Sequence, residues 1–215
     1  MTLWMFVVGI VSVGLLWLFL KRLWLGSTEG DRAESIKACL TKQAQKRQGR
    51  VHVRNGQYTL TFPYQTASLD VSAVISTEEV YLECTYATVR IDNLTDKDFK
   101  VLLNSDNLLL KPLVVGTRLE LDDEQFNDGY IVVGNDPAFI KNLFTREVRD
   151  KLRQAALQVK LGRRFNAAIL DREQGWLSVF MQGLRVEERV VDAMVETTML
   201  LYDRLNALNE HDNTN

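Results

Sequence analysis

The sequence predicts an α+β protein in which a single transmembrane helix precedes a domain with a mostly antiparallel sheet. The first twenty residues carry no charged side chain. Residues 51–133 consist of short segments rich in β-branched and aromatic residues, separated by turns of Asn, Asp and Gly. Residues 185–208 repeat apolar side chains at three- and four-residue steps, as in an amphipathic helix. The resulting organisation is an anchor at 1–25, a hinge at 26–30, a domain at 31–208 with a candidate subdivision into 31–125 and 126–208, and a disordered tail at 209–215.

The anchor prediction depends on length and flanking residues. A helix of twenty residues is about 30 Å long, which matches the hydrocarbon core of a bilayer. Trp4 lies near one end of the apolar run, and Trp17 and Trp24 lie near the other, as expected of indole rings at membrane interfaces. A cleaved signal peptide would carry basic residues before the run and small residues after it, whereas here 21–24 read Lys-Arg-Leu-Trp. We therefore expect residues 1–25 to contact membrane lipid.

Charge predicts the orientation of this span. Residues 21–50 have a net charge of +5, whereas residues 51–215 have a net charge of −7. Because cationic flanks stay in the cytoplasm, we expect the N-terminus outside and the domain in the cytoplasm, at an inner or plasma membrane. Seven cations near the predicted membrane surface form what we call the basic collar: Lys21, Arg22, Lys37, Lys42, Lys46, Arg47 and Arg50. The basic collar either binds anionic headgroups, at about 1 kcal/mol per cation, or only sets the topology.

The segment after the hinge predicts a helix followed by a hairpin. Asp31 is the expected N-cap of a helix over 32–47, and Gly49 is expected to end it. Two alternating runs between 51 and 62 surround Asn55-Gly56, a pair that favours a type I′ turn. Further strands are predicted near residues 68–75, 79–91, 98–103, 107–111, 117–121 and 129–133.

The last third of the chain predicts helices around a second hairpin. Asp136-Pro137 is typical of an N-cap followed by the first helical residue, in a short helix that ends at Phe144. Thr145 is expected to cap a helix over 146–159 that Gly162 ends. Strands at 164–170 and 176–181 and a helix at 185–208 complete the prediction. The order helix, glycine, hairpin at 31–62 recurs at 146–181, which suggests either a duplication or a common way of joining two elements.

Reactive residues are sparse in the sequence. The chain has two histidines and two cysteines, far apart, and lacks a phosphate-binding glycine motif. His52 alternates with valines and is expected to be an exposed strand residue. We predict no catalytic residue, no cofactor and no metal site, and the acidic body argues against nucleic acid as a partner. An acidic run is either a solvated turn or a cation or acid–base site, and comprises Glu120, Asp122, Asp123, Glu124 and Asp128.

One segment resembles known proteins. Phe126 to Pro137 reads FNDGYIVVGNDP, and Leu143-Phe144-Thr145, Leu152, a hairpin from Phe165 to Phe180 and the final helix follow. This pattern is similar to a segment of bacterial membrane-anchored proteins of uncharacterised function and covers residues 126–208. The resemblance implies a bacterial accessory membrane protein, and it transfers no catalytic residue because the matching positions are capping and packing residues.

Three functions are consistent with these features. The first is a non-enzymatic module that binds a protein partner of unknown identity at the membrane. The second is a domain that recognises anionic lipid or another acidic ligand through the basic collar. The third is a hydrolase or transferase that uses the carboxylates near 120–128.

Overall fold

The computed structural model describes residues 30–54, 57–74, 83–91, 97–104, 117–162, 175–184 and 186–212. The chain divides into two compact units, Met1–Ala38 and Cys39–Asn215, with the boundary inside a helix that covers 30–47. The predicted span and hinge residues 26–29 lie outside the described residues. Within the described ranges, no helix combines the length and apolar character that a membrane crossing requires.

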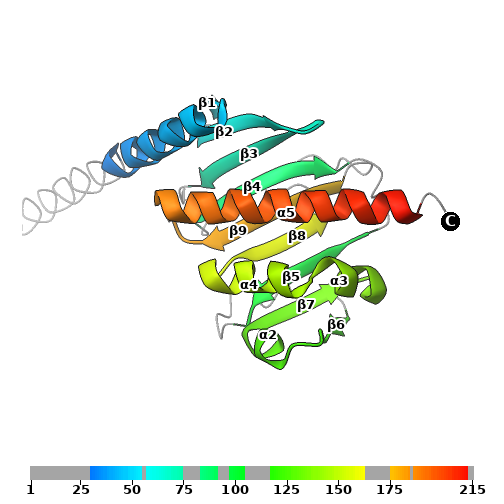
Figure 1. The fold of residues 1–215 in the computed structure, drawn as a ribbon. Helices are drawn as coiled ribbons and strands as arrows, with labels where there is room; N and C mark the ends of the chain where they lie inside the picture. The colour runs from blue at the N-terminus through cyan, green and yellow to red at the C-terminus, as the bar shows by residue number, and fades with distance from the viewer. Residues whose placement is uncertain are drawn as a thin grey trace, which may run out of the picture. The chain divides into compact units, whose positions relative to one another are not determined.

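The second unit is α+β, as predicted, and its described strands form a nine-stranded sheet in which every pairing is antiparallel. The sheet is continuous across the candidate subdivision at 125/126. The strand order in space is β1-β2-β3-β4-β9-β8-β5-β7-β6 (Figure 1). The strands are β1 (Arg50–Arg54), β2 (Gln57–Tyr64), β3 (Ala67–Val74), β4 (Cys84–Ile91), β5 (Phe99–Leu103), β6 (Arg118–Leu119), β7 (Tyr130–Gly134), β8 (Gln158–Gly162) and β9 (Gly175–Gln182).

One row of apolar side chains crosses the whole sheet. Residues in register share a face, and the seven inner members of this row are each at most 1 % exposed. Burying such a row contributes about 25 cal/mol for each Å² of apolar surface removed from water. In spatial order the row contains Val51, Leu60, Val71, Ala87, Val179, Val159, Val101, Val132 and Leu119.

The opposite face carries hydroxyl side chains in the corresponding positions. The Thr59 and Ser72 hydroxyls hydrogen-bond at 2.8 Å, and those of Thr88 and Ser178 do so at 3.1 Å. All four side chains are buried, so each pairing removes a desolvation cost that an unpaired hydroxyl would incur. The hydroxyl pairs share this face with a buried apolar cluster of Cys84, Tyr86, Leu102 and Phe180, so both faces of the sheet bury apolar side chains.

Figure 1 shows α3, α4 and α5 on one face of the sheet. The helices after β6 are α2 (Glu124–Gly129), α3 (Pro137–Leu143), α4 (Arg146–Ala155) and α5 (Glu188–Asp212). Asp136 caps α3 by accepting the Phe139 N–H, and Pro137 occupies its first turn, as predicted. The long amphipathic helix is confirmed, but it extends to residue 212, so the predicted disordered tail is wrong for residues 209–212.

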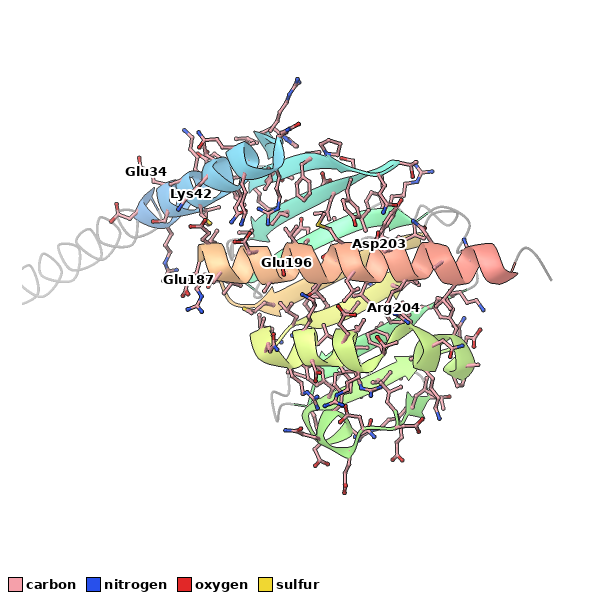
Figure 2. All side chains as sticks on the ribbon, viewed as in Figure 1. Glu34, Lys42, Glu187, Glu196, Asp203 and Arg204 are labelled. Carbon is pink, nitrogen blue, oxygen red and sulfur yellow. The ribbon has the colours of Figure 1, made fainter. Side chains whose placement is uncertain are left out.

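α5 is held from both sides as well as from the sheet. On one side, Tyr64 and Gln65, at the end of β2 and in the turn after it, donate hydrogen bonds to the Asp203 carboxylate, each with a shortest distance of 2.8 Å. On the other, Arg204 donates to the carbonyl oxygens of Asn142 at 2.9 Å and Leu143 at 3.2 Å, which end α3. Figure 2 labels Asp203 and Arg204 on this helix.

The prediction for residues 156–162 is wrong in two respects. α4 ends at Ala155 rather than at 159, because Ala156 adopts a left-handed conformation with φ 50°. The N–H of Leu157 then bonds to the Leu152 carbonyl at 2.9 Å, and β8 begins at Gln158. Gly162 is the last residue of β8, not a helix stop. β9 pairs with β8, whereas the predicted strand at 164–170 lies outside the described residues.

The helix over 30–47 also ends differently from the prediction. Gly30 and Asp31 are already helical, so Asp31 is not the N-cap and the predicted hinge does not include Gly30. Gln48, with φ 54°, takes the left-handed position that ends the helix. Gly49 is required for a different reason: a Cβ there would lie 2.8 Å from the Thr61 carbonyl oxygen.

Candidate functional site

The C-terminal part of this helix, residues 39–47, is joined to α5 by ion pairs. Lys42 bonds to Glu188 at 2.6 Å and Lys46 to Asp192 at 3.0 Å. Arg47 also pairs with Asp192, and its guanidinium lies 5.9 Å from the centre of the Phe62 ring. We call these five charged residues, three cations and two carboxylates, the helix–α5 joint.

Burial determines which parts of the joint contribute to stability. The Arg47 and Asp192 side chains are 13 % and 21 % exposed, whereas those of Lys42 and Glu188 are 68 % and 42 % exposed. Burial raises the pKa of Asp192, but hydrogen bonds from Arg47 and Lys46 outweigh it, and the pKa is lowered. Solvent screens the outer pair, so most of the coupling comes from Arg47 and Asp192.

The joint changes the interpretation of the basic collar. Lys42, Lys46 and Arg47 each have a carboxylate partner on α5. Lys37 and Arg50 are exposed. Lys21 and Arg22 lie outside the described residues. Three collar cations thus contribute to holding the domain together, which reduces the charge that they can offer to lipid.

The two cysteines lie in settings that oppose thiolate formation. Cys39 stands beside the joint, where burial and the nearby Glu188 and Asp192 carboxylates raise the pKa of its thiol. Cys84 is 4 % exposed, and burial raises the pKa of its thiol to about 12. Nucleophilic chemistry requires the thiolate, so neither group is suited to it.

The acidic run does not converge on a site. Glu120, Asp122, Glu124 and Asp128 are exposed. Within the described residues, no group of three or more His, Cys, Asp or Glu side chains is arranged to hold a metal ion. The residues from 124 onward form α2 instead of the predicted turn, because Asp123 caps this helix by accepting the Phe126 N–H at 3.0 Å.

Asp123 is the structural member of the run. Arg149 and Arg153 donate to its carboxylate at 2.9 and 3.2 Å. Burial raises the pKa of Asp123, but the Phe126 N–H and the two guanidinium groups outweigh it, so the pKa is lowered. A carboxylate held ionised by three donors connects α2 to α4 and is a poor general acid.

A cleft of about 650 Å³ opens between α4 and the first turns of α5. Its lining contains apolar side chains, namely Leu103, Ala155, Met181, Val190 and Ala193, together with the buried Thr197. Charged side chains of both signs surround this lining, namely Lys151, Arg153, Glu187, Arg189 and Glu196. Figure 2 labels Glu196 on α5 and Glu187, the residue directly before this helix. We call this feature the α4–α5 cleft.

Two details define its chemistry. Lys151 on α4 pairs with Glu196 on α5 at 3.3 Å, so one ion pair bridges the cleft. Gln182, in the lining, buries its side-chain amide nitrogen, and this nitrogen has no hydrogen-bond partner. Gln182 is in register with Cys84 and follows Met181 in β9, so by strand alternation its side chain lies on the sheet face opposite to the aliphatic row, and the amide does not point into the cleft.

Comparison of the chain with protein-family models, curated proteins and solved structures finds no match. The resemblance of residues 126–208 therefore stays a prediction. The sequence pattern missed the cleft because its lining combines strand ends and two helices that are distant in the chain. The amphipathic helix was the one signal that pointed to this region.

Proposed function

We propose that this protein is a single-pass membrane protein whose domain binds a protein partner through the α4–α5 cleft. In this proposal residues 1–25 span the membrane with the N-terminus outside, and the 31–208 domain lies in the cytoplasm. The domain is a non-enzymatic accessory module, and the membrane restricts where its partner can meet it.

The composition of the α4–α5 cleft carries the proposal. The apolar side chains of the lining supply a hydrophobic contribution to binding, and the charged side chains of both signs favour a partner that presents both signs. An anionic lipid headgroup or an inorganic anion would pair with the cations of the cleft, but it would offer no positive charge to Glu187 and Glu196.

Recognition of anionic lipid is the alternative function. The exposure of Lys42 and Lys46, at 68 % and 55 % of their side chains, favours it. Their pairing with Glu188 and Asp192 opposes it, because a headgroup would have to compete with carboxylates already in contact. For this reason we rank protein binding above lipid binding.

A pair of tryptophan substitutions tests the cleft. Ala193→Trp fills it, and Ala207→Trp adds the same side chain to an exposed position of the same helix outside it. Purify the full-length chain in mild detergent after cross-linking in membranes, and compare the proteins recovered. We expect one partner to be recovered with the wild type and with the Ala207 variant, and lost with the Ala193 variant. Equal recovery with both variants would exclude the cleft.

Two further measurements separate the remaining alternatives. A reporter fused to the C-terminus should be active only on the cytoplasmic side. Activity on the outer side would contradict the orientation. The full-length chain in nanodiscs should give the same exchange protection over 39–50 with neutral and with anionic lipid. Strong extra protection with anionic lipid would favour the lipid function.

A further inference from the structure

The sheet ends in two different edges. β6 closes one side with two residues, and such a short strand offers little backbone to a partner. β1 closes the other side with five residues, and no described strand lies beyond it. Val53 on β1 is 62 % exposed and is the exposed large hydrophobic residue among those described. The β1 edge is visible as the end of the sheet beside β2 in Figure 1.

The register identifies the backbone groups that face this edge. Arg54 is paired with Gln57, so the hairpin loop has two residues, and the residues flanking such a loop exchange both hydrogen bonds. Along an antiparallel ladder, hydrogen-bonded pairs alternate with pairs that are not hydrogen-bonded. His52 is therefore in a hydrogen-bonded pair with Thr59, and its backbone groups point toward β2. The N–H and C=O groups of Val51 and Val53 therefore point outward, away from β2.

The side chains of β1 select the partner. Arg50 and His52 lie on one face of the strand and are exposed, next to the neutral side chains of Thr61 and Thr59. Val51 and Val53 lie on the other face. We propose that the β1 edge binds an extended segment of another protein in which acidic residues alternate with apolar ones. The added strand would place carboxylates beside Arg50 and His52 and apolar side chains beside the valines.

A second copy of the chain fits this edge less well. Antiparallel pairing of two β1 strands about His52 would put the histidines opposite each other and bring basic residues of the two copies together. Like charges opposite each other in a sheet are destabilising. An acidic strand turns the same positions into favourable pairs. This surface lies outside the α4–α5 cleft, so the inference does not depend on the proposed function.

The probe is a fluorescein-labelled peptide, acetyl-Glu-Val-Glu-Val-Glu-amide, added to the full-length chain in mild detergent at low ionic strength. The control peptide has lysine in place of each glutamate. Val53→Pro removes an outward N–H without interrupting the ladder to β2, and Val53→Thr keeps that N–H. Fluorescence anisotropy measures binding, and hydrogen exchange locates it. Thermal unfolding of the unbound variants verifies that each is folded.

We expect the acidic peptide to bind and to slow exchange at Val51 and Val53, and the lysine peptide not to bind. Val53→Pro should weaken binding about tenfold or more, whereas Val53→Thr should keep it within about threefold. No binding, equal binding to both peptides, or protection in the α4–α5 cleft instead of β1 would overturn the inference. A dimer in sedimentation that Val53→Pro abolishes would also overturn it, because the edge would then bind a second copy. The result of the Ala193→Trp experiment concerns the α4–α5 cleft and does not change the binding expected at the β1 edge.

Discussion

Residues 39–64 and 146–182 are built on the same local design. In each, a helix ends in a left-handed residue that is not glycine, Gln48 in one and Ala156 in the other. In each, the next N–H bonds back five residues, from Gly49 to Ala44 at 2.8 Å and from Leu157 to Leu152 at 2.9 Å. This arrangement is a Schellman motif. A strand then begins at the following residue and pairs with an antiparallel neighbour.

These two segments, 39–64 and 146–182, differ in the position of their first strand in the sheet. β8 lies between β9 and β5, and Gln158 at its start is fully buried. β1 has only β2 beside it, and Arg50 at its start is exposed. The same local motif is therefore followed by a central strand in segment 146–182 and by an edge strand in segment 39–64. Local sequence builds the motif, and long-range pairing decides whether its backbone is accessible.

The largest expected contrast comes from proline in the two strands. Val159→Pro in β8 should lower the free energy of unfolding by at least about 3 kcal/mol, since it removes a buried ladder hydrogen bond and disturbs fully buried packing. Val53→Pro in β1 should cost less than about 1 kcal/mol because its N–H faces the open edge. Urea unfolding followed by circular dichroism measures both. Equal losses in the free energy of unfolding would contradict the assignment of β8 as a central strand and β1 as an edge strand.

The next contrast compares two fully buried leucines, one in each helix. Leu152→Ala in α4 should cost about 4 kcal/mol, near the upper end for leucine truncation. The Leu152 carbonyl also accepts the Tyr130 hydroxyl at 2.8 Å, so a shift of this turn would disturb that bond as well. Leu40→Ala in the first helix should cost about 2–3 kcal/mol. If Leu40→Ala lowered the free energy of unfolding more than Leu152→Ala in the same urea experiment, this expected order would be wrong.

Each helix is also held by one carboxylate, which allows a third comparison. Asp123→Asn should cost about 2–3 kcal/mol because it weakens the α2 cap and the bonds from Arg149 and Arg153. Asp192→Asn should cost about 1–2 kcal/mol because only Lys46 and Arg47 lose a charged partner. The control is Asp122→Asn, at a side chain 92 % exposed, which should change stability little.

The same two carboxylates determine a pH dependence. The folded pKa values of Asp123 and Asp192 are both lowered. A lowered folded pKa gives stability that is present above the unfolded pKa, near 4, and is lost as pH falls through the folded value. Stability should therefore decrease below about pH 4, and less steeply in Asp123→Asn and Asp192→Asn than in the wild type. Parallel pH profiles for all three proteins would contradict this assignment.

The smallest effect concerns the two left-handed residues. Gln48→Gly and Ala156→Gly should each stabilise the protein by about 0.5–1 kcal/mol, because glycine adopts positive φ without the steric cost that a Cβ brings. Similar gains in melting temperature would confirm that the two motifs are equivalent. A loss at one position would show that its side chain makes contacts that offset the strain.

Much of the fold could be predicted from local patterns. The hairpin of residues 51–62, the Asp136-Pro137 helix start and the long final helix follow from turn chemistry, capping and periodicity. The end of α4 could not, since Ala156 has no intrinsic preference for positive φ and only the start of β8 accounts for it. Likewise, the acidic run hid a helix cap because the arginines that hold Asp123 come from residues 149 and 153.

The candidate sites were less accessible to prediction. The sequence identified the basic collar as a cluster but not its partners, which lie on α5 about 146 residues away. The α4–α5 cleft and the β1 edge left no continuous pattern, because both depend on which strands lie side by side.

The sequence by itself determined the α+β class, the local motifs and the expectation of a membrane span, because each depends on neighbouring residues. Only the tertiary structure decided that one aliphatic row crosses nine described strands and that collar cations pair with α5. It also decided that β1 is an edge while β8 is central. Strand order and ion pairing depend on contacts between residues far apart in the chain, where no local preference operates.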